Sequence, residues 1–335
     1  MNCGAQSRFW LFAGLLLAAC LSGPSSTFAQ EKKGVPRAKV PQPEDITVET
    51  DDVELHCTYY PSARGKEAVP VILIHDWESR RTELDALAKY LQAEGEHAVL
   101  VPDLRGHGES NIRKVAPGTP AENLTPATLT DIDIVKMAST DFVYLKNEMI
   151  TRHNAGEFNI DLLTLVGLEL GANVALHWAA VDWSQPKVAV RLGHDVKALV
   201  LVSPQSVFKK LRITNPLNVP AVRAFLSVMT VGGTNDKDMK TELSRIHNAL
   251  AKYHREPKQM TGESDEEFAQ RRRRKKDYYP IEKDTILQGL ELVSAPNLNV
   301  ASNILGFINL RVVERRLEKD LPEWEGDRRK DPVPR

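Results

Sequence analysis

Gly167-Leu168-Glu169-Leu170-Gly171 is the stretch of this sequence that decides the fold. The apolar run 162–166 before it has the length and composition of a buried strand, and residues 172–180 after it have those of a buried helix. A glycine at each end of the stretch allows a strand and the next helix to pack closely across a sharp turn. The stretch therefore predicts a strand, a turn and a helix, with Glu169 at the point of the turn.

The pattern is that of a nucleophile elbow, G-x-S-x-G, in which a strained turn holds a serine above the edge of a sheet. Here Glu169 stands in the place of the serine. The alternative is that Gly167 and Gly171 are ordinary loop glycines, because a short motif has many accidental matches. The order of the surrounding elements decides between these two interpretations.

Composition allows one large domain and gives little indication of a partner. The chain has 335 residues, 42% of them hydrophobic, which suffices for the core of a single α/β domain. Its formal net charge of -1 gives no bulk attraction to nucleic acid or to an anionic membrane. We therefore expect no nucleic-acid partner, no cofactor and no metal, and look for the function in a specific site.

Residues 1–29 have the features of a signal peptide. Arg8 is their only charged side chain, residues 9–21 are apolar, and Thr27-Phe28-Ala29 offers small residues where signal peptidase cleaves. A lipoprotein signal is the alternative, because Leu17-Ala18-Ala19-Cys20 resembles a lipobox that ends in a lipidated cysteine. We expect a secreted or periplasmic protein, with membrane attachment only if Cys20 is lipidated.

Strands and helices alternate along the rest of the chain. We predict a disordered lead-in over 30–45, a folded domain over 46–317 and a flexible tail over 318–335. The alternating segments 46–50 and 53–60 predict an antiparallel hairpin, and the later alternation of strands with helices predicts parallel pairing. The predicted later strands are 69–74, 98–101, 162–166, 196–202, 226–231 and 285–293, and the predicted helices are 82–93, 131–152, 172–180, 237–253 and 300–316.

A charged insertion is predicted at about 254–283. It carries an acidic block at 263–267 and a basic run at 271–276. A basic run can mark a polyanion-binding site, but an acidic block nearby on the same helix partly neutralises it. We favour a solvated helix whose charges pair with one another.

Three further stretches accompany the elbow, namely VILIHDW at 71–77, VPDLRGHGES at 101–110 and VLVSP at 200–204. Together with the elbow they resemble the α/β-hydrolase family, in the group of small esterases, lipases and serine aminopeptidases. The resemblance runs from about residue 46 to 316. It implies an α/β-hydrolase fold, with a mostly parallel central sheet, an antiparallel N-terminal hairpin and helices on both faces.

The resemblance also implies where a site would lie. In this family, N–H groups that follow a His-Gly pair help to form the oxyanion hole, together with the residue after the nucleophile. His75-Asp76-Trp77 and Leu170 stand at those places. Glu169 stands at the nucleophile position. A carboxylate beside a helix N-terminus is stabilised as an anion, so we expect the Glu169 carboxylate itself in the oxyanion hole.

The other two members of a triad follow the nucleophile in chain order, first the acid and then the histidine. Asp236 matches the acid position, with Asp238 as the fallback, and the alternative for either is an N-cap or turn residue of the helix that begins at 237. The histidine is missing, because the last of the nine histidines is His254. Gln288 stands at its position, and an amide takes no proton near neutral pH.

Two functions remain open. The favoured one is a catalytically degenerate α/β-hydrolase-fold protein that binds a small molecule or a protein partner, because nucleophile and activator are lost together. The alternative is an active hydrolase of esters or related bonds, in which Glu169 acts as general base on water with His75, His247 or His254 assisting. Whether the chain is an enzyme is therefore left open by the sequence.

Overall fold

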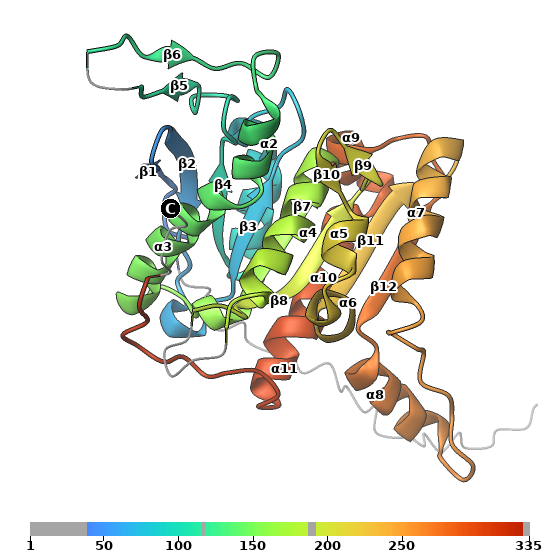
Figure 1. The fold of residues 1–335 in the computed structure, drawn as a ribbon. Helices are drawn as coiled ribbons and strands as arrows, with labels where there is room; N and C mark the ends of the chain where they lie inside the picture. Colours follow the sequence, from blue (N-terminus) through green and yellow to red (C-terminus); the bar gives the residue numbers. More distant parts are fainter. Residues whose placement is uncertain (1–38, 116–117, 187–191, 331–335) are drawn as a thin grey trace, which may run out of the picture. The chain divides into compact units, whose positions relative to one another are not determined.

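The computed structural model describes residues 39–115, 118–186 and 192–330 (Figure 1). The predicted signal peptide and most of the predicted lead-in lie outside these residues. The described residues belong to one compact unit that begins at Lys39. Within the described ranges, no helix is both long and apolar enough to cross a membrane.

An eight-stranded sheet forms the centre, in the order β1-β2-β4-β3-β7-β8-β11-β12. The first two strands form the predicted antiparallel hairpin, the second also pairs antiparallel with β4, and all later neighbours are parallel. This confirms the predicted fold class. The strands are β1 (Glu44–Glu49), β2 (Glu54–Tyr60), β3 (Pro70–Ile74), β4 (Ala98–Pro102), β7 (Leu163–Leu168), β8 (Val196–Val202), β11 (Ser227–Gly233) and β12 (Tyr278–Lys283).

Helices cover both faces of this sheet (Figure 1). Successive residues of a strand point to opposite faces, so Ile72 and Ile74 of β3 join one apolar cluster while Val71 and Leu73 join the other. The central strands are continuous apolar runs for this reason. One face is covered by α3 (Thr140–Asn154), α4 (Leu170–Trp183) and α7 (Lys237–Leu250), and the other by α1 (Asp85–Gly95), α9 (Gly289–Ser294) and α10 (Val300–Ile308).

Two predicted helices are interrupted. The predicted helix 131–152 is divided into α2 (Asp131–Met137) and α3, and the Ser139 hydroxyl between them donates to the Val135 carbonyl at 2.7 Å. Such back-bonding competes with the helical ladder. The closing helix α10 passes through a π-helical turn (Asn309–Val313) into α11 (Glu314–Leu317), and the turn carries the buried Arg311.

The predicted final strand at 285–293 is wrong. The last strand is β12, inside the predicted charged insertion, and residues 289–294 form α9 instead. β12 is an edge strand that tolerates Pro280 and exposed charges, so its sequence lacks the apolar run that identifies a central strand. The apolar residues Leu292 and Val293 are buried from a helix, against the cluster that contains α10.

The charged segment forms α8 (Asp265–Lys275). Arg271 pairs with Glu263 of the acidic block at 2.7 Å, but Glu263 lies before the helix, so the predicted pairing within one helix is not what forms. The partners of Arg272 and Arg274 lie outside the helix, at Glu256 and Glu318 respectively. Most of the basic run is therefore neutralised by carboxylates from neighbouring segments.

The segment after α11 is anchored where the sequence predicts a flexible tail. The Trp324 indole donates to the His153 carbonyl at 3.1 Å, and the Lys66 ammonium lies 3.8 Å from the centre of the Trp324 ring. Arg328 is buried and forms an ion pair with Asp195. These partners are distant in sequence, so the polar composition of the segment gives no indication of them.

Candidate functional site

The elbow has the predicted geometry. Glu169 lies between β7 and α4 with φ 49° and ψ -108°, a conformation that costs a residue with a side chain about 1–3 kcal/mol. A Cβ atom on Gly167 would lie 2.1 Å from the Gly171 carbonyl oxygen, and one on Gly171 would lie 2.2 Å from the Ile74 carbonyl oxygen. Only glycine fits at either position, so both are part of the elbow rather than ordinary loop glycines.

The Glu169 side chain reaches across the carboxyl edge of the sheet towards α9. Its backbone N–H donates to the Val202 carbonyl at 2.8 Å, which ties the turn to the end of β8. Its Oε1 atom lies where a Cβ atom on Gly289 would be, at a separation of 2.2 Å. Gly289, with a φ of 50°, therefore leaves the room that the Glu169 carboxyl group needs.

The oxyanion hole is occupied by Asp76. The N–H of Leu170, the residue after the elbow position, donates to Asp76 Oδ1 at 3.0 Å. The Trp77 N–H also acts to lower the pKa of the Asp76 carboxylate. These are the two N–H groups that the family arrangement assigns to the hole. The predicted placement of the Glu169 carboxylate in the hole is therefore wrong, because a neighbouring carboxylate already fills it.

Glu169 and Asp76 form a carboxyl pair. Burial raises the pKa of Glu169 to about 7, and the charge of Asp76, the hydrogen bond to Asp76 and the charge of Glu291 act in the same direction. Burial also raises the pKa of Asp76, against the opposing effect of the Leu170 and Trp77 N–H groups. Two carboxyl groups in contact do not both ionise easily, so they share one proton near neutral pH. The raised pKa favours a protonated Glu169 below about pH 7, whereas the sequence predicts an anion.

Asp236 is an N-cap. Its carboxylate accepts from the N–H groups of Asp238 and Met239, at 2.8 and 3.2 Å, at the start of α7. The helix-cap alternative is therefore what the structure shows for this residue. Asp236 nevertheless lines the same cavity as Glu169.

Gln288 lies in the loop before α9, and its side-chain amide makes three hydrogen bonds to neighbouring strand ends. Its Oε1 accepts from the Ser203 hydroxyl at 2.8 Å and from the Gly233 N–H at 3.2 Å, while its Nε2 donates to the Gly233 carbonyl at 2.9 Å. These hydrogen bonds connect the loop before α9 to the ends of β8 and β11. The side chain lines the cavity beside Glu169 but, as an amide, it cannot take up a proton near neutral pH.

The histidines do not complete a triad. In the part of the chain that the structure describes, none of them hydrogen-bonds to Glu169 or Asp236. His75 is fully buried, with Nδ1 donating to the Asp76 carbonyl at 2.6 Å and Nε2 accepting from the Leu104 N–H at 3.0 Å. Burial lowers the pKa of His75 to about 4, so it stays neutral. His247 and His254 pack by Tyr278, at the start of β12 and so at the opposite end of the sheet from the elbow.

A cavity of about 450 Å³ opens beside the elbow. Among the described residues that line it, Arg245 is the only cation, and it pairs with Glu242 at 2.7 Å. The predicted pocket residues His75, Asp76, Trp77 and Leu170 all lie outside this lining. The Trp77 ring packs against Phe208 and lies 3.9 Å from the Lys209 ammonium. Sequence reasoning missed the wall that the β9–β10 hairpin (Val207–Phe208 and Leu211–Arg212) and α7 supply. The lining residues are Glu169, Gln205, Ser206, Val207, Asp236, Asp238, Met239, Glu242, Arg245 and Gln288.

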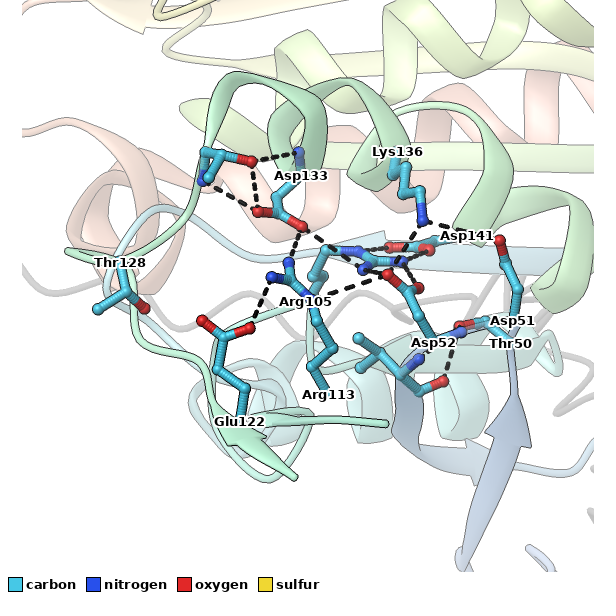
Figure 2. A network of polar contacts seen from close by, with 12 residues as sticks. Thr50, Asp51, Asp52, Arg105, Arg113, Glu122, Thr128, Asp133, Lys136 and Asp141 are labelled. Carbon is cyan, nitrogen blue, oxygen red and sulfur yellow. Dashed lines mark hydrogen bonds and ion pairs between the residues drawn. The ribbon is translucent and has the colours of Figure 1, made fainter. Parts of the chain in front are cut away.

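A buried ion-pair network supports the loop that follows β4. Figure 2 shows the Arg105 guanidinium between Asp52, from the turn of the N-terminal hairpin, and Asp141, from α3. Arg105 is fully buried, and its nitrogens lie 2.8 Å from Asp52 Oδ1 and 2.6 Å from Asp141 Oδ1. The network fixes the stretch 101–110, whose His107 packs against the Trp77 ring.

Comparison with known proteins agrees with this geometry. The sequence model described as the Alpha/beta hydrolase family matches residues 71–303, which is more than half of the chain. The chain belongs to the alpha/beta hydrolase family. No curated protein sequence matches this member of the family.

Solved structures similar to this hydrolase-family chain include several esterases. A fungal esterase from Rhizomucor miehei is 11% identical, with a TM-score of 0.54 over 82% of this chain and 86% of its own. An esterase from Pyrococcus furiosus is 12% identical, with a TM-score of 0.54 over 81% and 91% of the two chains. A dienelactone hydrolase from Anabaena variabilis is 13% identical, with a TM-score of 0.50 over 82% and 99%. At these identities the similarity shows the fold alone.

Proposed function

We propose that this alpha/beta hydrolase family member binds a small ligand in the cavity beside the elbow and does not hydrolyse esters by the serine mechanism of the fold. The observation that carries the proposal is the carboxyl pair of Glu169 and Asp76. One member stands at the nucleophile position and the other accepts the N–H of Leu170 at 3.0 Å. A serine mechanism requires a nucleophile, a base and free oxyanion donors. Here glutamate replaces the serine, no histidine in the described part of the chain hydrogen-bonds to Glu169 or Asp236, and Asp76 accepts the Leu170 N–H.

The cavity supports a small-molecule ligand. A volume of about 450 Å³ lies in the range of small-molecule sites. Asp236, Asp238 and Glu242 contribute negative charge to its wall, and Arg245 is already paired. Anionic ligands are therefore disfavoured, and the ligand that we expect is neutral or cationic.

An active hydrolase with a non-standard site is the second candidate, because a carboxyl group whose pKa is about 7 is suited to general acid-base catalysis. In that case the ionised form of Glu169 would take a proton from water. Such an enzyme would show a rate that rises with pH around Glu169's pKa, and Glu169→Gln would abolish it.

A substrate panel separates the two candidates. Short-chain acyl esters, aminoacyl arylamides and epoxides are assayed against the wild type, Glu169→Gln and, as a control from the same cavity, Asp238→Asn. We expect turnover of the wild type to equal that of Glu169→Gln and of buffer. Turnover that depends on Glu169 and survives Asp238→Asn would reject the binding function in favour of the hydrolase.

We further propose secretion or periplasmic export, on the basis of residues 1–29 alone. Mass spectrometry of the mature chain tests this. Cleavage after Ala29 supports it, and a retained Met1 would refute it.

A further inference from the structure

We propose that Asp76 is a built-in occupant of the oxyanion hole, which closes this site to acyl oxygens and carboxylates, and that the Glu169 carboxyl group holds it in place. The inference rests on the proposed function and makes Asp76 the residue that determines which ligands the site rejects.

The donors converge on one carboxylate. Leu170 is the first residue of α4, so its N–H has no partner within the helix and lies at the positive end of the helix dipole. It donates to Asp76 Oδ1 at 3.0 Å, and the Trp77 N–H acts on the same carboxylate by lowering its pKa. An external oxyanion needs both of these donors. It can bind there only by displacing Asp76.

The backbone holds Asp76 at this place. His75 fixes the loop from both sides, because its Nδ1 donates to the Asp76 carbonyl at 2.6 Å and its Nε2 accepts the Leu104 N–H at 3.0 Å. Gly171 brings the start of α4 directly against the end of β3, where its missing Cβ would lie 2.2 Å from the Ile74 carbonyl oxygen. The end of β3 and the start of α4 are therefore close in space, and the Asp76 side chain, two residues after β3, reaches the Leu170 N–H. The family resemblance has glycine at this position, which has no side chain to fill the hole.

Glu169 completes the arrangement through one proton. The raised pKa of Glu169 favours its protonated carboxyl group, and in the proposed arrangement this group donates to Asp76, which turns repulsion between two acids into attraction. Oε1 of Glu169 is confined on the other side by Gly289, so the carboxyl group has little room to turn away. The two unusual residues of the site, at the elbow and after His75, therefore act as a pair.

The charges around the pair set its response to pH. Glu291 of α9 acts on Glu169, and Glu78 acts on Asp76 from the same loop. The remaining charged groups at the site are Asp236, Asp238, Glu242 and Arg245 from α7 and Lys209 from the β9–β10 hairpin. Negative groups predominate, so loss of the shared proton leaves two adjacent carboxylates with little compensation. As pH rises through the pKa of Glu169, we expect the hydrogen bond from Glu169 to Asp76 to be lost and Asp76 to be held less firmly at the Leu170 N–H.

Amide NMR tests the occupancy directly. The Leu170 and Trp77 N–H signals of the full chain are followed during a pH titration and, at about pH 6 where Glu169 is protonated, during a titration with acetate. In the wild type we expect both signals to titrate with Glu169 and to ignore acetate. In Asp76→Gly we expect acetate to shift both signals in a saturable way. Glu266→Gln, at an exposed position of α8 outside the site, should behave as the wild type.

Two further variants keep the test decisive. Asp76→Asn preserves the side-chain shape if Asp76→Gly fails to fold, and it should move the Leu170 signal as the charged acceptor is lost. Glu169→Gln should keep both signals bonded but abolish their pH titration. Acetate shifts of equal size in the wild type and in Asp76→Gly, or a Leu170 signal indifferent to Asp76→Asn, would overturn the inference. Ester turnover by the wild type would reject the proposed function but would leave these signals unchanged, so the two failures are distinguishable.

Discussion

At the scale of single residues, the protonation of Glu169 depends on what the elbow turn puts next to it. The same turn that would expose a nucleophile aims the Glu169 side chain at Asp76 and Gly289. A helix N-terminus alone would favour the anion, but its first free N–H is taken by Asp76. Burial and the charge of Asp76 therefore both favour the neutral form of Glu169.

We expect Glu169→Gln to stabilise the protein at high pH. The pKa of Glu169 is about 7 in the fold against an ordinary 4.5, so between these values the folded state binds more protons than the unfolded state. The free energy of unfolding then falls as pH rises through this window, and the loss is complete above it. Glutamine has no such loss. Because Glu169 is partly exposed, we discount the effect. We expect Glu169→Gln to raise the free energy of unfolding by about 1–2 kcal/mol at about pH 8 and to leave it unchanged at about pH 4.

Urea denaturation at the two pH values measures this difference. Glu266→Gln, at an exposed position of α8, serves as the control and should change little at either pH. An equal effect of Glu169→Gln at both pH values would contradict the expected protonation of Glu169.

The elbow was predictable from the sequence, whereas its chemistry was not. Gly167 and Gly171 follow from a local steric requirement, which a five-residue pattern records completely. The contact between Glu169 and Asp76 joins two loops that only the parallel pairing of β3 with β7 brings together. The sequence did contain one relevant sign, an aspartate where the resemblance has glycine after His75.

At the scale of elements, the Arg105 network determines how the N-terminal hairpin meets α3. Burial raises the pKa of Asp141, and Arg105 opposes that rise through a hydrogen bond and its charge. Asp52 adds a second carboxylate from the hairpin turn, and Lys136 of α2 lies 3.0 Å from it (Figure 2). One buried cation thus connects three elements that are separate in sequence.

We expect Arg105→Met to be strongly destabilising. The substitution leaves Asp141 buried without its cation, and removing one partner of a buried pair costs about 3–5 kcal/mol. Chemical denaturation measures the loss. Arg113→Met, which removes a partly exposed arginine of the same network, should cost much less. If Arg105→Met/Asp141→Leu is no more stable than Arg105→Met, the unpaired Asp141 is not the source of the loss.

The wrong final strand shows the limit of pattern reading at this scale. Central strands such as β8 are buried on both faces and are evident as apolar runs. β12 pairs with β11 on one side only, carries Pro280 and has only a weak alternation of apolar and polar residues. The more apolar segment 285–293 therefore fits the strand pattern better, although it does not form the strand. The error shifted the strand boundary but left Gln288 beside the cavity, because the loop after β12 still ends there.

At the scale of the whole molecule, the segment after α11 closes a cluster of buried charges. Lys146 is fully buried between Asp182 and Asp195, at 2.9 and 2.7 Å. Burial acts to raise the pKa of Asp195, but the charges of Lys146 and Arg328 outweigh it and hold that pKa well below its ordinary value. Arg328 also pairs with Asp161. A residue near the end of the described chain therefore neutralises carboxylates that precede β7 and β8.

We expect Arg328→Gln to cost about 3–5 kcal/mol, because it leaves buried carboxylates with one cation fewer. The sign with pH follows from the lowered pKa of Asp195, since the stability that this group contributes is present at neutral pH and is lost as pH falls through its folded pKa. The difference between the wild type and Arg328→Gln should therefore shrink in strong acid. Arg329→Gln, the exposed neighbour, is the matched control and should stay within about 0.5 kcal/mol of the wild type. Equal unfolding midpoints for the two variants would mean that the segment lies on the domain without contributing to its stability. A loss of stability confined to Arg328→Gln would mean that the ion pairs of Arg328 with Asp161 and Asp195 stabilise the whole domain.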